Sequence, residues 1–244
     1  MESTGTGNNF VSEIKLSKEH GVTIFGGLTD STDLDPGVSK KWHTPNGDGW
    51  FNSSRVDGFV LHLDTNGQYK SSHIWAAKSA GSVVIYSADI DDLGNIYMTG
   101  DFYGVVDWDL SSDSLEKSQT GLGTAFVVKL NNDNSFDWVN INSTSGDPSK
   151  AVGIDIAIDI QGNVVVVGEF HSVISFNSAF SRYVLTSASD QFHSFRSTDI
   201  FVVIFNNNGK HKWSGRLGGV AYDRAGSLAL NEYGEIFLTG SFTE

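Results

Sequence analysis

Aspartate residues gather in two stretches whose spacing could hold a metal ion. Asp30, Asp33 and Asp35 occur within the segment DSTDLDPG. A second acidic group comprises Asp101, Asp107 and Asp109. Calcium takes roughly six to eight oxygen ligands, and alternate carboxylates on a flexible loop can supply some of them. We expect solvated or turn-capping carboxylates and no cofactor, with a calcium site at Asp30, Asp33 and Asp35 as the alternative.

Aromatic residues stand beside polar ones in the segment KKWHTPNGDGWFN. The side chains that could form a ligand site there are Trp42, His43, Asp48, Trp50 and Phe51. Exposed indole rings can stack on a sugar while neighbouring polar groups bond its hydroxyls. The segment is therefore predicted to bind a glycan or protein ligand, and the alternative is that its rings cover the adjacent part of the fold.

Signals for catalysis are weak throughout the chain. No metalloprotease, nucleophile-elbow or P-loop motif occurs, and with Cys 0 neither a thiolate metal site nor a catalytic cysteine is possible. Carboxylates such as Asp89, Asp155 and Glu169 could serve a glycosidase, which uses a pair of them. We expect a non-enzymatic protein, with a carbohydrate-active hydrolase or lyase as the alternative.

Charge and hydropathy exclude several classes of partner. The chain has 16 basic and 29 acidic side chains and a formal charge of −13, which repels nucleic acid and anionic lipid. No apolar run approaches the ~20 residues that cross a bilayer. The segment MESTGTGNNFVSEIKLSKEH lacks the pattern of a secretory signal. Neither nucleic acid binding nor membrane insertion is expected.

Two patterns repeat along the chain and define the elements that must position these residues. The first is a glycine, five mostly strand-forming residues and another glycine, at Gly21–Gly27, Gly94–Gly100, Gly162–Gly168 and Gly234–Gly240. The second, centred on Phe59, Phe126 and Phe201, follows the first three copies. The chain is expected to form a single domain with repeats at about 10–75, 82–141, 151–216 and 222–244.

Each repeat is predicted to contain four short antiparallel strands. The first two are joined by turns such as Asp91-x-x-Gly94-Asn95, in which aspartate bonds the turn backbone and glycine accepts a positive φ. The second and third strands are joined by long polar connections, over residues 28–56, 102–123 and 170–198. These connections are all expected to leave the fold on one face, which would carry the binding surface.

Such units are typical of β-propeller blades. The sequence predicts an all-β, β-propeller-type array of four-stranded antiparallel blades, about three and a half in this chain. Trp138 and Trp213 recur at one strand position and are expected to pack between blades. The triplets beginning at Asp33, Asp107 and Ser175 occupy equivalent positions, and Trp108 within the second is expected to be structural.

The segments GNIYMTGDF (Gly94–Phe102), AFVVKLN (Ala125–Asn131) and DIQGNVVVVGEF (Asp159–Phe170) resemble the bacterial β-propeller repeat family of the SBBP type. The resemblance extends from about Phe10 onward. It implies an adhesion, binding or scaffold module of a larger bacterial surface or secreted protein, at an extracellular location, with no shared catalytic residues. A purely structural spacer and a cytoplasmic location are the alternatives.

The strand pattern ends in a half repeat. Counting from Phe10 gives three complete units and two further strands, so the second strand of the last unit, around Ile236–Leu238, is expected to expose an unpaired edge. We therefore expect further blades to come from the parent chain or from another subunit.

Overall fold

The computed structural model describes residues 2–3, 7–17, 21–45, 55–78, 81–176, 183–188 and 197–243. The described residues form antiparallel sheets, and no helix occurs among them. The expectation of an all-β chain is confirmed. Consistent with this, the described part of the chain offers no helix that could cross a membrane.

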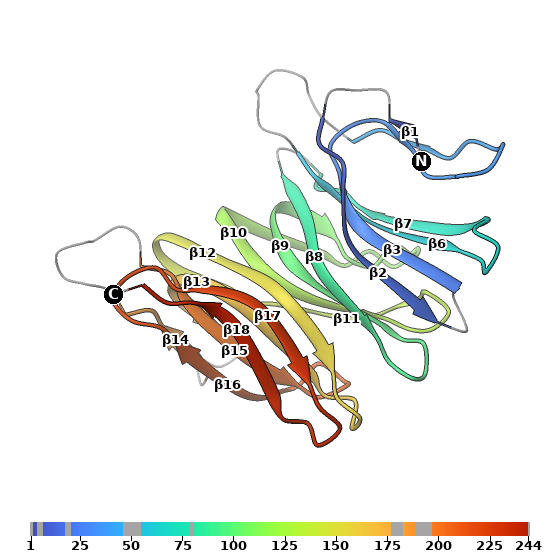
Figure 1. The fold of residues 1–244 in the computed structure, drawn as a ribbon. Helices are drawn as coiled ribbons and strands as arrows, with labels where there is room; N and C mark the ends of the chain where they lie inside the picture. The colour runs from blue at the N-terminus through green and yellow to red at the C-terminus, as the bar shows by residue number, and fades with distance from the viewer. Residues whose placement is uncertain are drawn as a thin grey trace.

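Two four-stranded sheets, a third sheet of five strands and a final hairpin follow one another along the chain (Figure 1). The first sheet contains β2 (Phe10–Ser17), β3 (Gly21–Leu28), β6 (Asp57–Leu63) and β7 (Tyr69–Trp75). The second contains β8 (Ser82–Ile90), β9 (Ile96–Asp107), β10 (Glu116–Leu130) and β11 (Phe136–Ile141). The third contains β12 (Ser143–Ile158), β13 (Val164–Ser175), β15 (Asp199–Phe205) and β16 (His211–Leu217), with β14 (Val184–Thr186) paired to β13. The hairpin is β17 (Arg224–Leu230) and β18 (Ile236–Ser241).

A small additional sheet joins the start of the chain to the connection between β3 and β6. Its strands are β1 (Glu2–Ser3), β4 (Thr32–Asp33) and β5 (Trp42–His43), in the order β1, β4, β5. All of its pairings are antiparallel. The first long connection therefore has strand structure of its own.

The second glycine of the repeated pattern lets two strands approach closely. Each first strand has an irregularity in register opposite this glycine, as between Ile85 and Ser87 in β8. A Cβ atom on Gly100 would lie 1.8 Å from the carbonyl oxygen of Val84, so no larger residue fits. In the first sheet the equivalent residue is Gly26, since a Cβ there would lie 2.0 Å from the Phe10 oxygen. The predicted alignment on Gly27 is thus wrong by one residue.

The sheets pack face to face in chain order, with their first strands side by side. Strand β8 contacts the first sheet, β12 contacts β8 and β9, and β17 contacts β12 and β13. Ser87, Asp155 and Ser227 have equivalent registers, opposite Thr99, Val167 and Thr239 respectively. The Asp155 carboxylate accepts hydrogen bonds from both serine hydroxyls, at 2.7 and 2.8 Å, and from the Leu228 amide at 2.8 Å. One carboxylate thus joins three consecutive first strands.

The hydrophobic core is divided into layers between neighbouring sheets. One cluster includes Phe25 and Trp75 from the first sheet and Phe102 and Phe126 from the second. A second cluster joins Tyr97 and Val127 of the second sheet to the third. Each sheet is therefore apolar on both faces where it has a neighbour on both sides.

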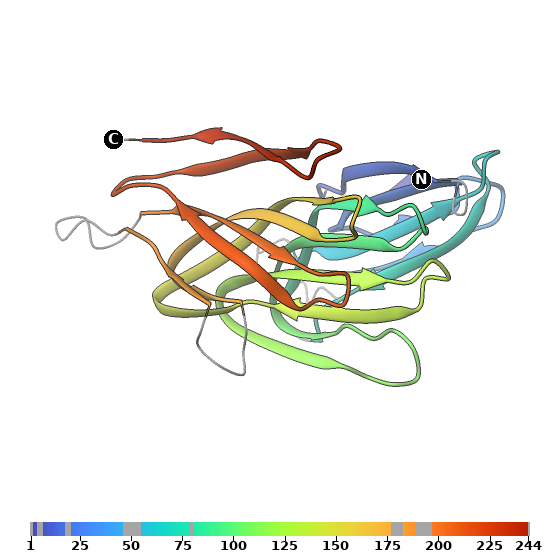
Figure 2. The ribbon, with the colours of Figure 1, turned by 90° about the horizontal axis from the view of Figure 1, so that it is seen from below.

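The row of sheets is open in both views of the ribbon, with the N- and C-termini at opposite ends (Figures 1 and 2). The described strands form no closed propeller ring. In Figure 2 the hairpin of β17 and β18 lies at one end of the row, and its β18 edge has no strand partner in the described part of the chain.

Candidate functional site

The structure places two of the five predicted ligand residues in the short strand β5. Trp42 is 47% exposed and lies opposite Asp33 in β4. His43 bonds through Nε2 to Oδ2 of Asp57, 2.8 Å away. Asp48, Trp50 and Phe51 lie outside the described residues, so the predicted site at this connection stays a prediction.

The predicted calcium ligands hold their own loop together. Asp33 is buried; its Oδ1 accepts hydrogen bonds from the amides of Asp35 and Lys41, and its Oδ2 lies 2.9 Å from Lys40 Nζ. The Lys41 amide and the Lys40 ammonium hold the pKa of Asp33 below its usual value. Asp35 accepts the Gly37 amide, and Asp30 accepts the Gly7 amide. No cluster of three metal-ligating side chains occurs within the described ranges.

Removal of divalent metal is therefore expected to leave the fold intact. With EDTA added to the purified protein, we expect the melting temperature to change by no more than about two degrees, because backbone amides and a lysine already satisfy Asp33. Differential scanning calorimetry with and without chelator measures this. A fall of more than about ten degrees would instead support the alternative of a calcium site.

The long connections between second and third strands share one structural feature at their tips. An amide donates to the carbonyl oxygen seven residues later, which closes a hairpin tip. The bonds are Leu34 to Lys41 (3.0 Å), Trp108 to Leu115 (3.0 Å) and Phe176 to Tyr183 (3.2 Å). In the second tip Asp107 caps the turn by accepting the Leu115 amide at 2.8 Å, as Asp33 accepts the Lys41 amide in the first.

The sequence predicted that the long connections leave the fold on one face. The tips instead turn back toward the core. The β9–β10 hairpin folds back so that Trp108 is 1% exposed, with ring centroids 5.1 Å from Phe102 and 4.7 Å from Phe126. Trp75 of the first sheet donates from Nε1 to the Trp108 carbonyl at 3.3 Å. The hairpin closes the space between two sheets because removing the apolar Trp108 ring from water lowers the free energy of the fold. The structural role expected of Trp108 is confirmed.

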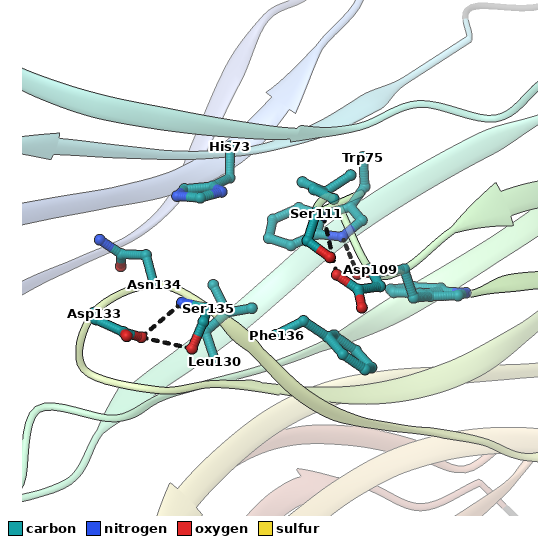
Figure 3. Close-up of a pocket in the computed structure, with 11 residues that line it drawn as sticks. His73, Trp75, Asp109, Ser111, Leu130, Asp133, Asn134, Ser135 and Phe136 are labelled. Atoms are coloured by element: carbon teal, nitrogen blue, oxygen red, sulfur yellow. Dashed lines mark hydrogen bonds between the residues drawn. The ribbon is translucent and has the colours of Figure 1, made fainter. Parts of the chain in front are cut away.

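A small cavity of about 230 Å³ remains beneath this tip (Figure 3). His73 and Trp75 come from β7, Asp109 and Ser111 from the hairpin tip, and residues 130–136 from the turn between β10 and β11. Asp133 accepts hydrogen bonds from the amide and hydroxyl of Ser135, as Figure 3 shows. The cavity is smaller than the roughly 300–1,000 Å³ of ordinary ligand sites.

The equivalent space between the second and third sheets is a groove of about 830 Å³. It is lined by residues 116–119 and 139–142 of the second sheet and its connections, and by Ser143, Phe176, Tyr183 and residues 209–211 from the third. This volume falls within the usual range for ligand sites. We call it the inter-sheet groove.

Side-chain bulk explains why one space is nearly filled and the other is open. Register places Asn142 at the position of Trp75 and Phe176 at the position of Trp108. Gly209 likewise stands where the earlier turn has Asn134. At each of these three positions the smaller side chain lines the larger space. The inter-sheet groove therefore follows from local sequence differences between copies of one repeat.

Aromatic rings form one wall of the groove. Tyr183 stacks on His211, with ring centroids 3.8 Å apart and planes 23° from parallel, and Phe176 lies nearly parallel to His211 at 6.1 Å. Burial lowers the pKa of His211, and neither ring nitrogen has a hydrogen-bond partner among the described residues. His211 is therefore a neutral ring that supports Tyr183, which remains 38% exposed.

The turn between β15 and β16 fixes the groove's floor against the second sheet. Trp138 donates from Nε1 to the Asn207 oxygen at 3.0 Å, and Asn140 donates from Nδ2 to the Gly209 oxygen at 2.7 Å. Trp138 thus packs between sheets as expected. Trp213, at the equivalent position of the third sheet, is 51% exposed, because no third-to-fourth-strand turn covers it in the described chain.

A separate group of ionisable side chains surrounds Asp101 in β9. Burial raises the pKa of Asp101 to about 6, with Lys150 and a hydrogen bond from Tyr86 opposing the shift. Burial also raises the pKa of Glu169, the equivalent residue of β13. The other two nominated carboxylates have structural roles: Asp155 joins the first strands, and Asp89 accepts the Ile158 amide at 3.0 Å.

Replacing Asp101 by asparagine is expected to stabilise the protein at neutral pH. The carboxyl pKa is about 6 in the fold and 3.8 when unperturbed. Between pH 3.8 and about 6 the folded state keeps the Asp101 proton, whereas the unfolded state has lost it. The free energy of unfolding therefore falls as the pH rises through this range. Asp101→Asn should gain about 1–3 kcal/mol at pH 8 and almost nothing at pH 4. Urea unfolding across this pH range is the measurement; a gain independent of pH would contradict the assignment.

No protein-family model matches this chain, and no curated protein matches it either.

Proposed function

We propose that this chain is a non-enzymatic binding module built on a β-propeller-type array of blades. In this proposal the three sheets are blades, their first strands line the axis of the array, and β17 and β18 begin a fourth blade. Asp155, bonded to the equivalent serines of the neighbouring first strands, supports this arrangement. The resemblance to SBBP-type repeats agrees with it and suggests a bacterial surface or secreted protein.

The observation that carries the binding function is the inter-sheet groove. It combines ligand-sized volume, an exposed aromatic ring and amide side chains, and among the described residues Glu116 is the one carboxylate that lines it. A binding site needs such complementarity, whereas a glycosidase needs two carboxylates about the scissile bond. The groove is therefore better suited to holding a ligand than to hydrolysing one.

A glycan array combined with a hydrolysis screen of the bound glycans tests the function. We expect binding without turnover. Turnover would favour the carbohydrate-active enzyme. Neither binding nor hydrolysis of any glycan would favour a structural spacer within a larger protein.

The enzyme alternative has one observation in its favour. Asp101, with its raised pKa and its bond to Tyr86, resembles a general acid more than any other described carboxylate does. If the screen shows turnover, Asp101→Asn should abolish it.

A partner that completes the fourth blade is also part of the proposal. The β18 edge carries Phe237, 57% exposed, and could pair with a strand from another part of a parent protein or from another subunit.

A further inference from the structure

We propose that the inter-sheet groove binds a short oligosaccharide, with Tyr183 as the ring on which one sugar unit stacks. The inference rests on the proposed binding function and assigns its ligand class. It places that ligand between the second and third sheets, away from the β4–β5 connection that the sequence pointed to.

The aromatic wall supplies a rigid apolar surface of the right kind. Tyr183 is fixed from behind by His211, and His211 by Phe176, so the tyrosine ring is held in place before a ligand arrives. Aromatic side chains held in this way lose little conformational freedom on binding. The exposed part of the Tyr183 ring can cover the C–H face of a pyranose.

The opposite wall supplies hydrogen-bonding groups suited to hydroxyls. Asn140 uses Nδ2 for the Gly209 oxygen, so its Oδ1 remains an acceptor. Gln119 donates Nε2 to the Thr120 oxygen, which leaves Oε1 as an acceptor. Ser118 adds a hydroxyl that both donates and accepts, and Ser143 at the start of β12 adds another from the third sheet. Sugar hydroxyls match such a mixture, since each one can donate and accept.

The charge of the groove argues against a cationic ligand. Its charged lining residues are Glu116, Lys117 and Lys210, and Glu116 is paired with Lys78. The groove is thus neutral to slightly basic in a chain whose formal charge is −13. A neutral or weakly acidic saccharide fits this better than a basic peptide does.

The test is calorimetric titration of the folded chain with cello-, chito-, galacto- and uronic-acid oligosaccharides, using wild type and three variants. Tyr183→Ala removes the stacking ring and should weaken binding about tenfold or more, as expected for losing over ~1.4 kcal/mol of contact. Tyr183→Phe keeps the ring and should bind within about threefold of wild type. Tyr233→Ala removes an equally simple but distant tyrosine, 78% exposed, and should bind as wild type.

A fourth variant keeps the test valid if Tyr183→Ala fails to fold. Gln119→Ala lies on the opposite wall and should weaken binding about threefold. Oligosaccharide binding that neither Tyr183→Ala nor Gln119→Ala changes would overturn the inference while leaving the binding function in place. Capture of an extended peptide instead of any saccharide would overturn the ligand class. Failure to bind either would contradict the proposed function itself.

Discussion

Replacing Trp108 by alanine should lower the stability of the protein by about 3–5 kcal/mol, the usual cost of removing a large buried aromatic side chain. In a chain of this size the melting temperature should fall by roughly ten degrees. The reason is the position of Trp108 between two sheets, where its ring contacts Phe102 and Phe126 and its carbonyl accepts Trp75 Nε1. Without the ring, the small cavity beneath the hairpin tip would become a large void.

Trp213→Ala is the matched control for this prediction. It removes the same side chain from a position that is 51% exposed. Its effect should stay below about 1 kcal/mol. Equal losses for the two variants, measured by urea unfolding, would show that the β9–β10 hairpin does not close the space between the sheets.

Asp155→Ala should cost about 2–4 kcal/mol, because several donors lose one charged acceptor at once. Ser87, Ser227 and the amides of Ile156 and Leu228 all bond this carboxylate. Asp155→Asn should cost about half as much, since the amide oxygen replaces one carboxylate oxygen and the amide nitrogen cannot accept. Asp92→Ala, a change at an exposed turn, should have almost no effect.

The same experiments report on cooperativity between sheets. If Asp155 joins three first strands, its loss should lower the unfolding midpoint of the whole chain. A separate early transition confined to the β17–β18 hairpin would show that the hairpin is coupled to the third sheet only locally.

The order of strands was predictable because backbone geometry fixes the residues that mark it. The second glycine of the pattern is required because the bulge in each first strand brings backbone atoms too close for a side chain. A Cβ atom on Gly100, for example, would overlap the carbonyl oxygen of Val84. The turn glycines at 94 and 162 have φ values of +83° and +77°, which few other residues adopt. The first copy misled the alignment because Gly26 and Gly27 are adjacent, and spacing alone cannot choose between them.

The candidate groove was not predictable in the same way. Its volume depends on which side chains from three separate segments meet, and Asn142 and Phe176 line an open space only because no tryptophan stands in their place. One signal was present: Leu34, Trp108 and Phe176 are large apolar residues at equivalent positions of otherwise polar connections. Such a residue indicates a tip that turns back to the core, and the long connections would then have been placed between sheets.

For the first connection, the sequence picked out residues that the structure places in an ordinary short strand. Trp42 and His43 were singled out because aromatic and polar residue types stand together in their segment. The structure gives them a short strand with one side chain exposed and the other bonded to Asp57. Residue types alone could not distinguish a ligand contact from an ordinary strand position.

Cross-linking of paired cysteines tests the blade array most directly. Because the chain has Cys 0, the introduced thiols are the ones that react. Ser87→Cys with Asp155→Cys places thiols on neighbouring first strands whose present side-chain oxygens are 2.7 Å apart. A short bis-alkylating reagent should link residues 87 and 155, and likewise 155 and 227, in folded monomer analysed by mass spectrometry. Asp92→Cys with Asp155→Cys places one thiol in the exposed turn after β8, away from the Ser87 position, and should link far less. Efficient linkage of 92 to 155, or none of 87 to 155, would contradict the blade array.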